Sequence, residues 1–364
     1  MNPSTATSID LSQIVIKTFK PKEASQDTWD KLHPFREKNF RELYPDDSLP
    51  NREITEKNYM MGWAGFEDHY SIIYKDNLEE EIIASIHYSY VRKDAPDFEK
   101  NKHNSYFYII IASEYRRQGL GTKLFENILK KITDERDCKN AETDSYRTSG
   151  KAFCEKMGAQ LINVGAENRL QMKDVNWDLI NNWIAEGPQQ APNVTLENYS
   201  IAPEKDIVEL SKLETELEAE MPSLDESEDK WEDVYTPEKL REHEKKLKNS
   251  GTIRYVLITR EKDGTISGMT ETRYNPNDRL ERVSQGLTGI RKEYRGKGLG
   301  KWLKAQMCLY VKENYPKATY ITTGNAEHNA PMMSINNRLG FKSISEEKSY
   351  KFNVKETLVR LQKK

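Results

Sequence analysis

The sequence predicts an α/β protein made of two similar domains. The segment I-x-x-E-Y-R-x-x-G-L-G occurs twice, at residues 111–121 and 290–300. Each copy follows a short run of strand-forming residues and precedes a helix with an apolar stripe. The two copies lie about half of the 364-residue chain apart. We infer an internal duplication of one α/β unit.

The boundary between the two halves is predicted at the segment G-P-Q-Q-A-P, residues 187–192. Clustered glycine and proline interrupt regular structure, so such a segment suits a linker. We therefore divide the chain into an N-terminal domain, residues 1–187, and a C-terminal domain, residues 188–364. The first of these ends in a linking helix.

In the first half, alternating apolar residues predict strands and a three-to-four-residue apolar repeat predicts helices. The Asp-Asn turn at 76–77 joins two of the strands as a hairpin. The expected strands are 14–19, 69–75, 82–92, 106–111, 140–145, 161–164 and 169–172, and the expected helices are 27–43, 53–60, 120–132, 150–157 and 177–185.

The second half repeats this order with an Asp-Gly hairpin turn at 263–264. A strongly acidic connection, residues 214–233, follows its first helix. The expected strands are 199–202, 254–259, 266–274, 283–290 and 320–323, and the expected helices are 203–218, 237–248, one that begins at 299 and a short one that ends at 340.

The repeated glycine turn is suited to an anion. Glycines let successive backbone N–H groups converge, and the following helix adds free donors and the positive end of its dipole. A G-x-x-x-x-G-K-[ST] loop would need glycine at Arg295 and Ser or Thr at Trp302. The spacing also differs from the dinucleotide-binding G-x-G-x-x-G. A nucleotide-binding protein stays open as an alternative.

Both turns resemble the pyrophosphate-binding motif Q/R-x-x-G-x-G/A of the GNAT superfamily of acyl-CoA N-acyltransferases. Its fixed positions are filled by Arg116, Gly119 and Gly121 in one copy and by Arg295, Gly298 and Gly300 in the other. Residues 151–159 and 325–341 are similar to the segment that closes that fold. The resemblance implies two tandem domains, each a twisted mixed β-sheet flanked by helices, similar in arrangement to mycothiol synthase and other two-domain acetyltransferases.

The same resemblance implies acetyl-CoA as the acyl donor, with strand backbones pairing to its pantetheine arm. The residues expected to contact it are Thr288, Ile290, Arg295, Gly296, Lys297, Gly298, Leu299, Gly300, Lys301, Asn325 and Asn329 in the second copy, and Ile111, Arg116, Arg117, Gln118, Gly119, Gly121 and Thr122 in the first. The second copy is expected to be catalytic, because residues 142–147 of the first lack the Asn-x-x-x-Asn pattern of 325–329.

Many members of the superfamily place a Tyr four residues before the glycine of the closing helix, where Cys154 and Asn336 stand here. Asn336 is expected to donate a hydrogen bond to the departing thiolate. A primary amine must lose a proton to attack a thioester, so we expect a carboxylate base, Glu271 first and Glu220 second. The missing Tyr favours the alternative of a non-catalytic acyl-CoA-binding or regulatory protein.

Composition argues against several other classes. The net charge is −3, with 36% hydrophobic and 32% charged residues, so no basic excess indicates nucleic acid. No apolar run reaches the roughly 20 residues that cross a bilayer, and residues 1–13 lack a signal-peptide pattern. Three scattered cysteines and dispersed histidines predict no metal site. We expect a cytoplasmic protein without nucleic-acid or membrane partners.

The acceptor is predicted to be a cationic small molecule or peptide amine. Ten acidic residues crowd the connection 214–233, which borders the acceptor cleft in GNAT-like folds. Such a negative field attracts ammonium groups. A solvated acidic loop is the simpler alternative for the same residues.

Overall fold

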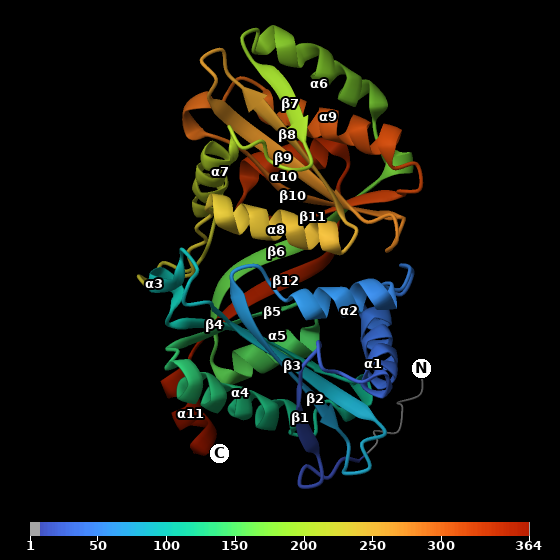
Figure 1. Ribbon diagram of the computed structural model, residues 1–364, viewed down its shortest axis with the longest axis vertical. Coiled ribbons are helices and arrows are strands. Elements are labelled where there is room, and N and C mark those ends of the chain that lie inside the picture. Colours follow the sequence, from blue (N-terminus) through green and yellow to red (C-terminus); the bar gives the residue numbers. More distant parts are fainter. Residues whose placement is uncertain (1–7, 364) are drawn as a thin grey trace. The chain divides into compact units, whose positions relative to one another are not determined.

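The computed structural model describes residues 8–363, which form two compact units (Figure 1). The described part of the N-terminal unit contains residues 8–162, 225–231 and 348–363, and the C-terminal unit contains 163–224 and 232–347. Each unit has one mixed sheet flanked by helices, which confirms the predicted fold class. The boundary between residues 187 and 188 divides the sequence copies and stays a prediction.

The sheet of the N-terminal unit has the strand order β1-β2-β3-β4-β5-β12. Its strands are β1 (Val15–Phe19), β2 (Phe66–Tyr74), β3 (Ile82–Val91), β4 (Asn104–Ile111), β5 (Asn140–Ser145) and residues 348–353 of β12 (Lys342–Asn353). Its α-helices are α1 (Gln26–Leu43), α2 (Arg52–Met61), α3 (Phe98–Asn101), α4 (Leu120–Arg136), α5 (Thr148–Met157) and α11 (Val354–Gln362).

The sheet of the C-terminal unit has the order β6-β11-β10-β9-β8-β7. Its strands are β6 (Gln160–Gln171), β7 (Thr195–Tyr199), β8 (Ile253–Arg260), β9 (Ile266–Tyr274), β10 (Arg282–Ile290) and β11 (Tyr320–Ala326). Its α-helices are α6 (Trp177–Gln190), α7 (Ile207–Ala219), α8 (Pro237–Asn249), α9 (Leu299–Asn314) and α10 (Ala330–Leu339). None of the helices within residues 8–363 is long and apolar enough to span a bilayer.

Each unit takes its closing strand from the other half of the sequence. After α5 the chain enters β6, whose residues 165–171 pair antiparallel with β11. After α10 the chain enters β12, whose residues 348–353 pair antiparallel with β5. The two copies have therefore exchanged their last strands, and the compact units do not follow the sequence halves.

Alternation along the central strands explains how helices cover both faces of a sheet. In β8, Val256 and Ile258 pack with α7, whereas the intervening Leu257 packs with Leu303 and Met307 of α9. Successive side chains of a strand point to opposite faces, so a strand without polar interruption needs helices on both sides.

Two predicted breaks are absent from the structure. Residues 187–190 continue α6 through Pro188, because a proline in the last turn removes only one hydrogen bond, and the helix ends at Gln190. Residues 161–172 are almost entirely one strand, β6, instead of two. Gly165 lies inside that strand, where an added Cβ would meet the backbone oxygen of Asn325, so this glycine permits close strand packing and does not make a turn.

Candidate active site

Both units contain two parallel strands that separate after a short pairing. β4 pairs with β5 only through residues 104–106 and 140–142. In the C-terminal unit, β10 pairs with β11 only through residues 282–284 and 320–322. Beyond these points, the ends of the strands leave an opening in the sheet, at the carboxyl edge where α/β sheets commonly bind ligands.

The glycine turn after the central strand has the same geometry in both copies. Gly119 precedes α4 with φ +87°, and Gly298 precedes α9 with φ +75°. These left-handed values explain why glycine is required. Arg116 Nε donates to the carbonyl of Ile111 at 2.8 Å, and Arg295 Nε donates to the carbonyl of Ile290 at 2.8 Å. We call this repeated turn the cradle.

Each cradle arginine is paired with a carboxylate at the end of a helix, Arg116 with Glu42 in the last turn of α1 and Arg295 with Glu220 directly after α7. Arg116 Nη2 lies 2.6 Å from Glu42 Oε2, and Arg147 Nε also approaches this carboxylate, at 3.3 Å. Burial and the adjacent Arg116 lower the pKa of the Arg147 guanidinium. One carboxylate thus serves two guanidinium groups in the N-terminal unit, which leaves positive charge for an anion.

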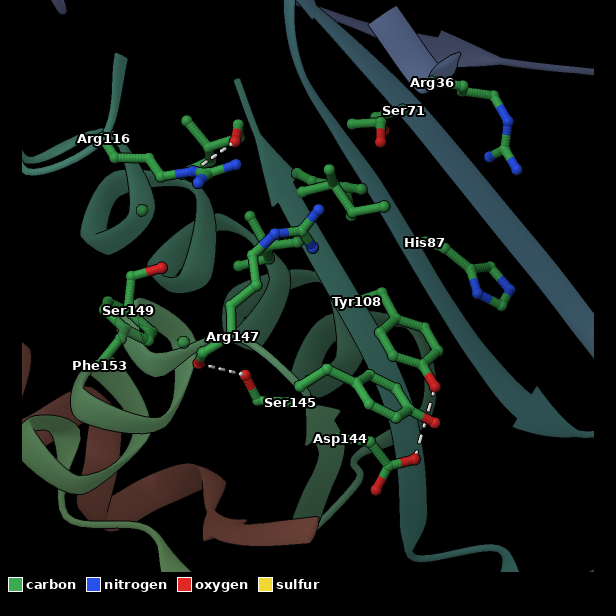
Figure 2. Close-up of a pocket in the computed structure, with 18 of the residues that line it drawn as sticks. Arg36, Ser71, His87, Tyr108, Arg116, Asp144, Ser145, Arg147, Ser149 and Phe153 are labelled. Atoms are coloured by element: carbon green, nitrogen blue, oxygen red, sulfur yellow. Dashed lines mark hydrogen bonds between the residues drawn. The ribbon is translucent and has the colours of Figure 1, made fainter. Parts of the chain in front are cut away.

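A cavity of about 760 Å³ extends from the cradle of the N-terminal unit (Figure 2). It has the size of a small-molecule site. Of the residues predicted to contact acetyl-CoA in the first copy, it is lined by Ile111, Arg116, Arg117, Gly119, Gly121 and Thr122. Gln118 is not part of the lining, because its amide bonds to the backbones of Ile9 and Glu114.

A row of aromatic side chains crosses the sheet at one wall of this cavity. Tyr70 of β2 lies opposite His87 of β3, which lies opposite Tyr108 of β4. The Tyr70 and His87 rings are stacked with centroids 4.7 Å apart. Because the strand register aligns these three residues, the row is a property of the sheet and not of a loop.

His87 is oriented by a carboxylate. Its Nε2 lies 2.7 Å from Oδ1 of Asp68, and Oδ2 of Asp68 accepts the backbone N–H of Trp63 at 2.6 Å. A carboxylate only accepts hydrogen bonds, so Nε2 carries the proton and Nδ1 of a neutral imidazole keeps its lone pair. The Trp63 ring packs edge-on against the imidazole at 4.8 Å. This arrangement suits a general base.

Asp144 supplies the acidic group of the cavity. It is the next-to-last residue of β5, and its Oδ2 accepts a hydrogen bond from the hydroxyl group of Tyr106 and lies 3.4 Å from that of Tyr108. The two hydroxyl groups also bond to each other at 2.6 Å. Figure 2 shows Asp144 and Tyr108 on the same side of the cavity as His87, Arg116 on the opposite side, and Arg147 between them.

The repeat relates His87 to Glu271, the residue predicted as the base of the second copy. The last residue of β4, Ile111, pairs with Ala84, and the last residue of β10, Ile290, pairs with Gly268. His87 follows Ala84 by three residues, and Glu271 follows Gly268 by three residues. The two copies thus place different side chains at one equivalent position.

Glu271 does not have the surroundings of a base. It is 2% exposed, its Oε2 accepts from Arg254 Nε at 2.7 Å, and its Oε1 pairs with Arg273. Burial alone would raise the pKa of Glu271, but Arg273 and Arg254 outweigh it and hold the pKa at about 2. A carboxylate so firmly ionised is a weak proton acceptor.

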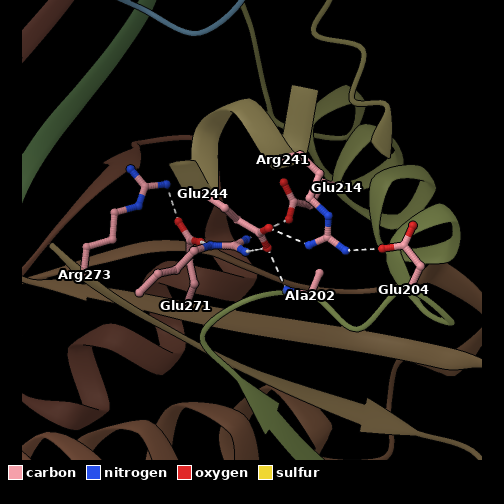
Figure 3. Close-up of polar contacts among 8 residues, drawn as sticks. Ala202, Glu204, Glu214, Arg241, Glu244, Glu271 and Arg273 are labelled. Carbon is pink, nitrogen blue, oxygen red and sulfur yellow. Dashed lines mark hydrogen bonds and ion pairs between the residues drawn. The ribbon is translucent and has the colours of Figure 1, made fainter. Parts of the chain in front are cut away.

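The ion pairs around Glu271 extend through the space between β8, β9 and the helices α7 and α8 (Figure 3). Arg254 Nη2 lies 3.0 Å from Glu214 Oε1, and its Nη1 lies 3.5 Å from Glu244 Oε1. Glu244 also accepts the backbone N–H of Ala202 at 2.7 Å. The C-terminal unit therefore fills this region with its own charged side chains.

The other predicted residues of the second copy have local partners. Asn336 Nδ2 donates to Asn325 Oδ1 at 2.7 Å, and Asn329 caps α10 by accepting from the backbone N–H of Met332. Glu220 pairs with Arg295. Of the remaining positions, the Thr288 hydroxyl group shares a hydrogen bond of 2.7 Å with that of Thr270, and Leu299 belongs to the hydrophobic core. The amine of Lys297 lies over the ring of Tyr294. Gly296, Gly300 and Lys301 belong to the cradle and the start of α9. Their roles toward acetyl-CoA stay predictions.

Cys154, which stands where many relatives have a Tyr, is 4% exposed, and burial raises the pKa of its thiol to about 12. It is a core residue of the N-terminal unit. Sequence reasoning missed Arg36, His87, Asp144 and Arg147, which all line the cavity. The alternation Ser85-His87-Ser89 along a predicted strand was the available indication, because it places polar groups on one face.

Comparison with known protein families gives one match. Residues 29–159 match the model of the acetyltransferase (GNAT) family. This segment contains the first cradle, His87 and Asp144. No curated protein matches the chain by sequence.

Solved structures share the fold over nearly the entire chain. A tandem GNAT protein from the clavulanic acid biosynthesis pathway is 16% identical with a TM-score of 0.73, covering 94% of this chain and 99% of that one. A GCN5-related N-acetyltransferase from Sphaerobacter thermophilus is 14% identical with a TM-score of 0.65, covering 95% of this chain and 97% of that one. Saccharomyces cerevisiae N-myristoyltransferase with bound myristoyl-CoA and inhibitors is 11% identical with a TM-score of 0.61, covering 96% of this chain and 82% of that one. These likenesses establish the tandem GNAT fold.

Proposed function

We propose that the protein transfers an acetyl group from acetyl-CoA to a primary amine, because residues 29–159 match the model of the acetyltransferase (GNAT) family. We further propose that the reaction takes place in the cavity of the N-terminal unit. The observation that carries this proposal is the continuity of that cavity from the cradle to His87 and Asp144.

The residues of the N-terminal unit fit acetyl-CoA. The cradle offers backbone N–H groups at the start of α4 and the guanidinium of Arg116, which suit a pyrophosphate. The separated edge of β4, which ends at Ile111, offers unpaired backbone groups to the pantetheine arm. Acetyl-CoA supplies the thioester, whose acyl group is activated toward an amine.

His87 is the proposed proton acceptor. Direct attack forms the C–N bond and breaks the C–S bond, so the nitrogen loses one proton and the departing thiolate gains one. Nδ1 of His87, left free by the bond from Nε2 to Asp68, takes the proton directly or through one water. Water is the proposed proton source for the thiolate, because Cys154 is buried in the core.

The C-terminal unit is proposed to support the fold without turnover. At the position equivalent to His87 it holds Glu271, whose carboxylate is committed to Arg254 and Arg273. A non-catalytic acyl-CoA-binding protein is the second candidate function, favoured by the absence of a tyrosine at Cys154 and Asn336.

The test is release of free thiol from acetyl-CoA with a panel of primary amines, comparing the parent with His87→Gln and Asp68→Asn. We expect turnover in the parent and a loss of about 10²–10⁴-fold in kcat for His87→Gln, with smaller loss for Asp68→Asn. Acetyl-CoA affinity should stay unchanged in both variants. Binding without thiol release for every amine would favour the non-catalytic alternative.

A further inference from the structure

The cavity of the N-terminal unit has a net positive lining, and one of its cations lies away from the cradle. Its charged lining residues are Arg36, Arg116, Arg117, Arg147, Lys156 and Asp144. The cradle accounts for Arg116 and Arg117, and Arg147 shares Glu42 with Arg116. Arg36 belongs to none of these groups. It comes from α1, and Figure 2 shows it near Ser71 and His87, away from the cradle.

Arg36 has a neutral partner only. Its Nη1 donates to the hydroxyl group of Tyr59, and its guanidinium carbon lies 4.8 Å from the centre of that ring. Within residues 8–363 no carboxylate pairs with Arg36. The half-buried guanidinium has four further N–H donors and a full positive charge, so an anion is the partner that it lacks.

Tyr59 connects Arg36 to the row that contains the proposed base. The ring centroids of Tyr59 and Tyr70 are 5.0 Å apart, and those of Tyr70 and His87 are 4.7 Å apart. Arg36 and His87 therefore lie at two ends of one aromatic wall. A ligand on this wall would meet a cation at one end and the proton acceptor at the other.

The repeat shows what occupies the equivalent place in the C-terminal unit. Arg36 precedes Glu42, the carboxylate on the first cradle arginine, by six residues, and Glu214 precedes Glu220 by the same number. Glu214 is buried and pairs with Arg254 at 3.0 Å. The C-terminal unit thus completes its ion pair internally, whereas the N-terminal unit presents the guanidinium of Arg36 to a cavity without a carboxylate partner.

Resting on the proposed function, we infer that the acceptor is a primary amine that also carries an anionic group, a carboxylate or a phosphate, which binds Arg36. Its amine then faces His87 and Asp144. This replaces the expectation of a purely cationic acceptor. At least six of the ten acidic residues that motivated that expectation are in ion pairs: Glu214 with Arg254, Glu216 with Arg291, Glu220 with Arg295, Asp225 and Asp229 with Lys351, and Asp233 with Lys239.

The experiment compares matched amines that differ only in the anionic group. γ-Aminobutyrate is compared with γ-aminobutyramide, phosphoethanolamine with ethanolamine, and putrescine serves as the dication. Thiol release is measured for the parent, Arg36→Gln, Arg36→Lys and Lys38→Gln. Lys38 is the control for loss of charge from α1, because it is exposed and pairs with Glu114 outside the cavity lining.

We expect kcat/KM in the parent to favour an anionic amine over its neutral match by about 10- to 100-fold, the range of a hydrogen bond to a charged group. The ratio should fall to about threefold or less in Arg36→Gln, mainly through KM, and should persist in Lys38→Gln and partly in Arg36→Lys. Whether the carboxylate or the phosphate pair shows the larger ratio identifies the anion.

Two results would overturn the inference: a preference of the parent for putrescine, or a preference for anionic amines that Arg36→Gln leaves unchanged. Calorimetric binding of each amine in the absence of acetyl-CoA separates this failure from that of the proposed function. Anion-dependent binding that Arg36→Gln abolishes supports the inference even without thiol release, whereas thiol release without an anion preference supports only the proposed function.

Discussion

Replacing Glu271 by Gln should destabilise the C-terminal unit without removing the chemistry. Glu271 is fully buried between Arg254 and Arg273, which hold its pKa at about 2, against 4.5 for an ordinary Glu carboxyl. A shift of this size corresponds to about 3 kcal/mol of stability at neutral pH, net of the cost of burial. The same magnitude is typical when one partner of a buried ion pair is removed.

The pH dependence follows from the sign of the shift. Because the folded pKa lies below the unfolded one, the stabilisation is complete above about pH 4.5 and is lost as the pH falls toward 2. Urea unfolding followed by circular dichroism should therefore give a difference of about 3 kcal/mol between parent and Glu271→Gln at pH 7, falling to about 1 kcal/mol at pH 3.

Glu220→Gln is the matched control. Glu220 was the second predicted base, but its side chain and that of its partner Arg295 are 41% and 49% exposed, so its removal should cost less than about 1 kcal/mol. Both variants should keep the parent's kcat at temperatures where they are folded. The reasoning fails if Glu271→Gln is as stable as the parent and loses about 100-fold or more in kcat, because Glu271 would then be the base.

Two further predictions concern buried charges. Glu142 has one carboxylate oxygen without a hydrogen-bond partner in residues 8–363, and burial raises its pKa to about 7. The folded form therefore loses stability as the pH rises from about 4.5 through 7. In calorimetric unfolding, Glu142→Gln should be about 3 kcal/mol more stable than the parent at pH 8 and nearly equal to it at pH 5. Burial lowers the pKa of Lys304 to about 8, and its Nζ donates to Gln285 at 2.8 Å. The free energy of unfolding of Lys304→Met should exceed that of the parent by about 2 kcal/mol at pH 7, net of the lost hydrogen bond. This difference should shrink as the pH rises from about 8 to about 10.5. Equal stabilities at both pH values would refute either account.

The sequence was sufficient for the fold class and the cradles because these depend on local patterns. A left-handed glycine before a helix, as at Gly119 and Gly298, is required by the turn itself and is visible in the repeated segment. The same holds for strand alternation and for the hairpin turns. Such features need no knowledge of distant partners.

The exchange of closing strands could not be predicted, because β6 and β12 have the length and alternation that suit either sheet. Which of two similar edges a strand joins is decided by long-range packing. The role of Gly165 depends equally on a distant neighbour, Asn325.

The surroundings of Glu271 and His87 could not be predicted from the sequence for a related reason. Glu271 has the residue type of a base, but its partners Arg254 and Arg273 come from the register of β8 with β9 and from its own strand. His87 lies at the equivalent position beside a cavity whose walls are assembled from α1, α2, β2, β3 and β4. A carboxylate's role as base or structural ion depends on these neighbours, which only the folded chain supplies.

The central claim is that the N-terminal cradle holds the acyl-CoA that reacts. The direct measurement compares kcat/KM for acetyl-CoA in Gly119→Val and Gly298→Val. Both glycines have left-handed φ angles, +87° and +75°, so the backbone strain of the two substitutions is matched. We expect a loss of about 100-fold or more for Gly119→Val and less than about threefold for Gly298→Val. A large loss for Gly298→Val with turnover retained in Gly119→Val would contradict the account.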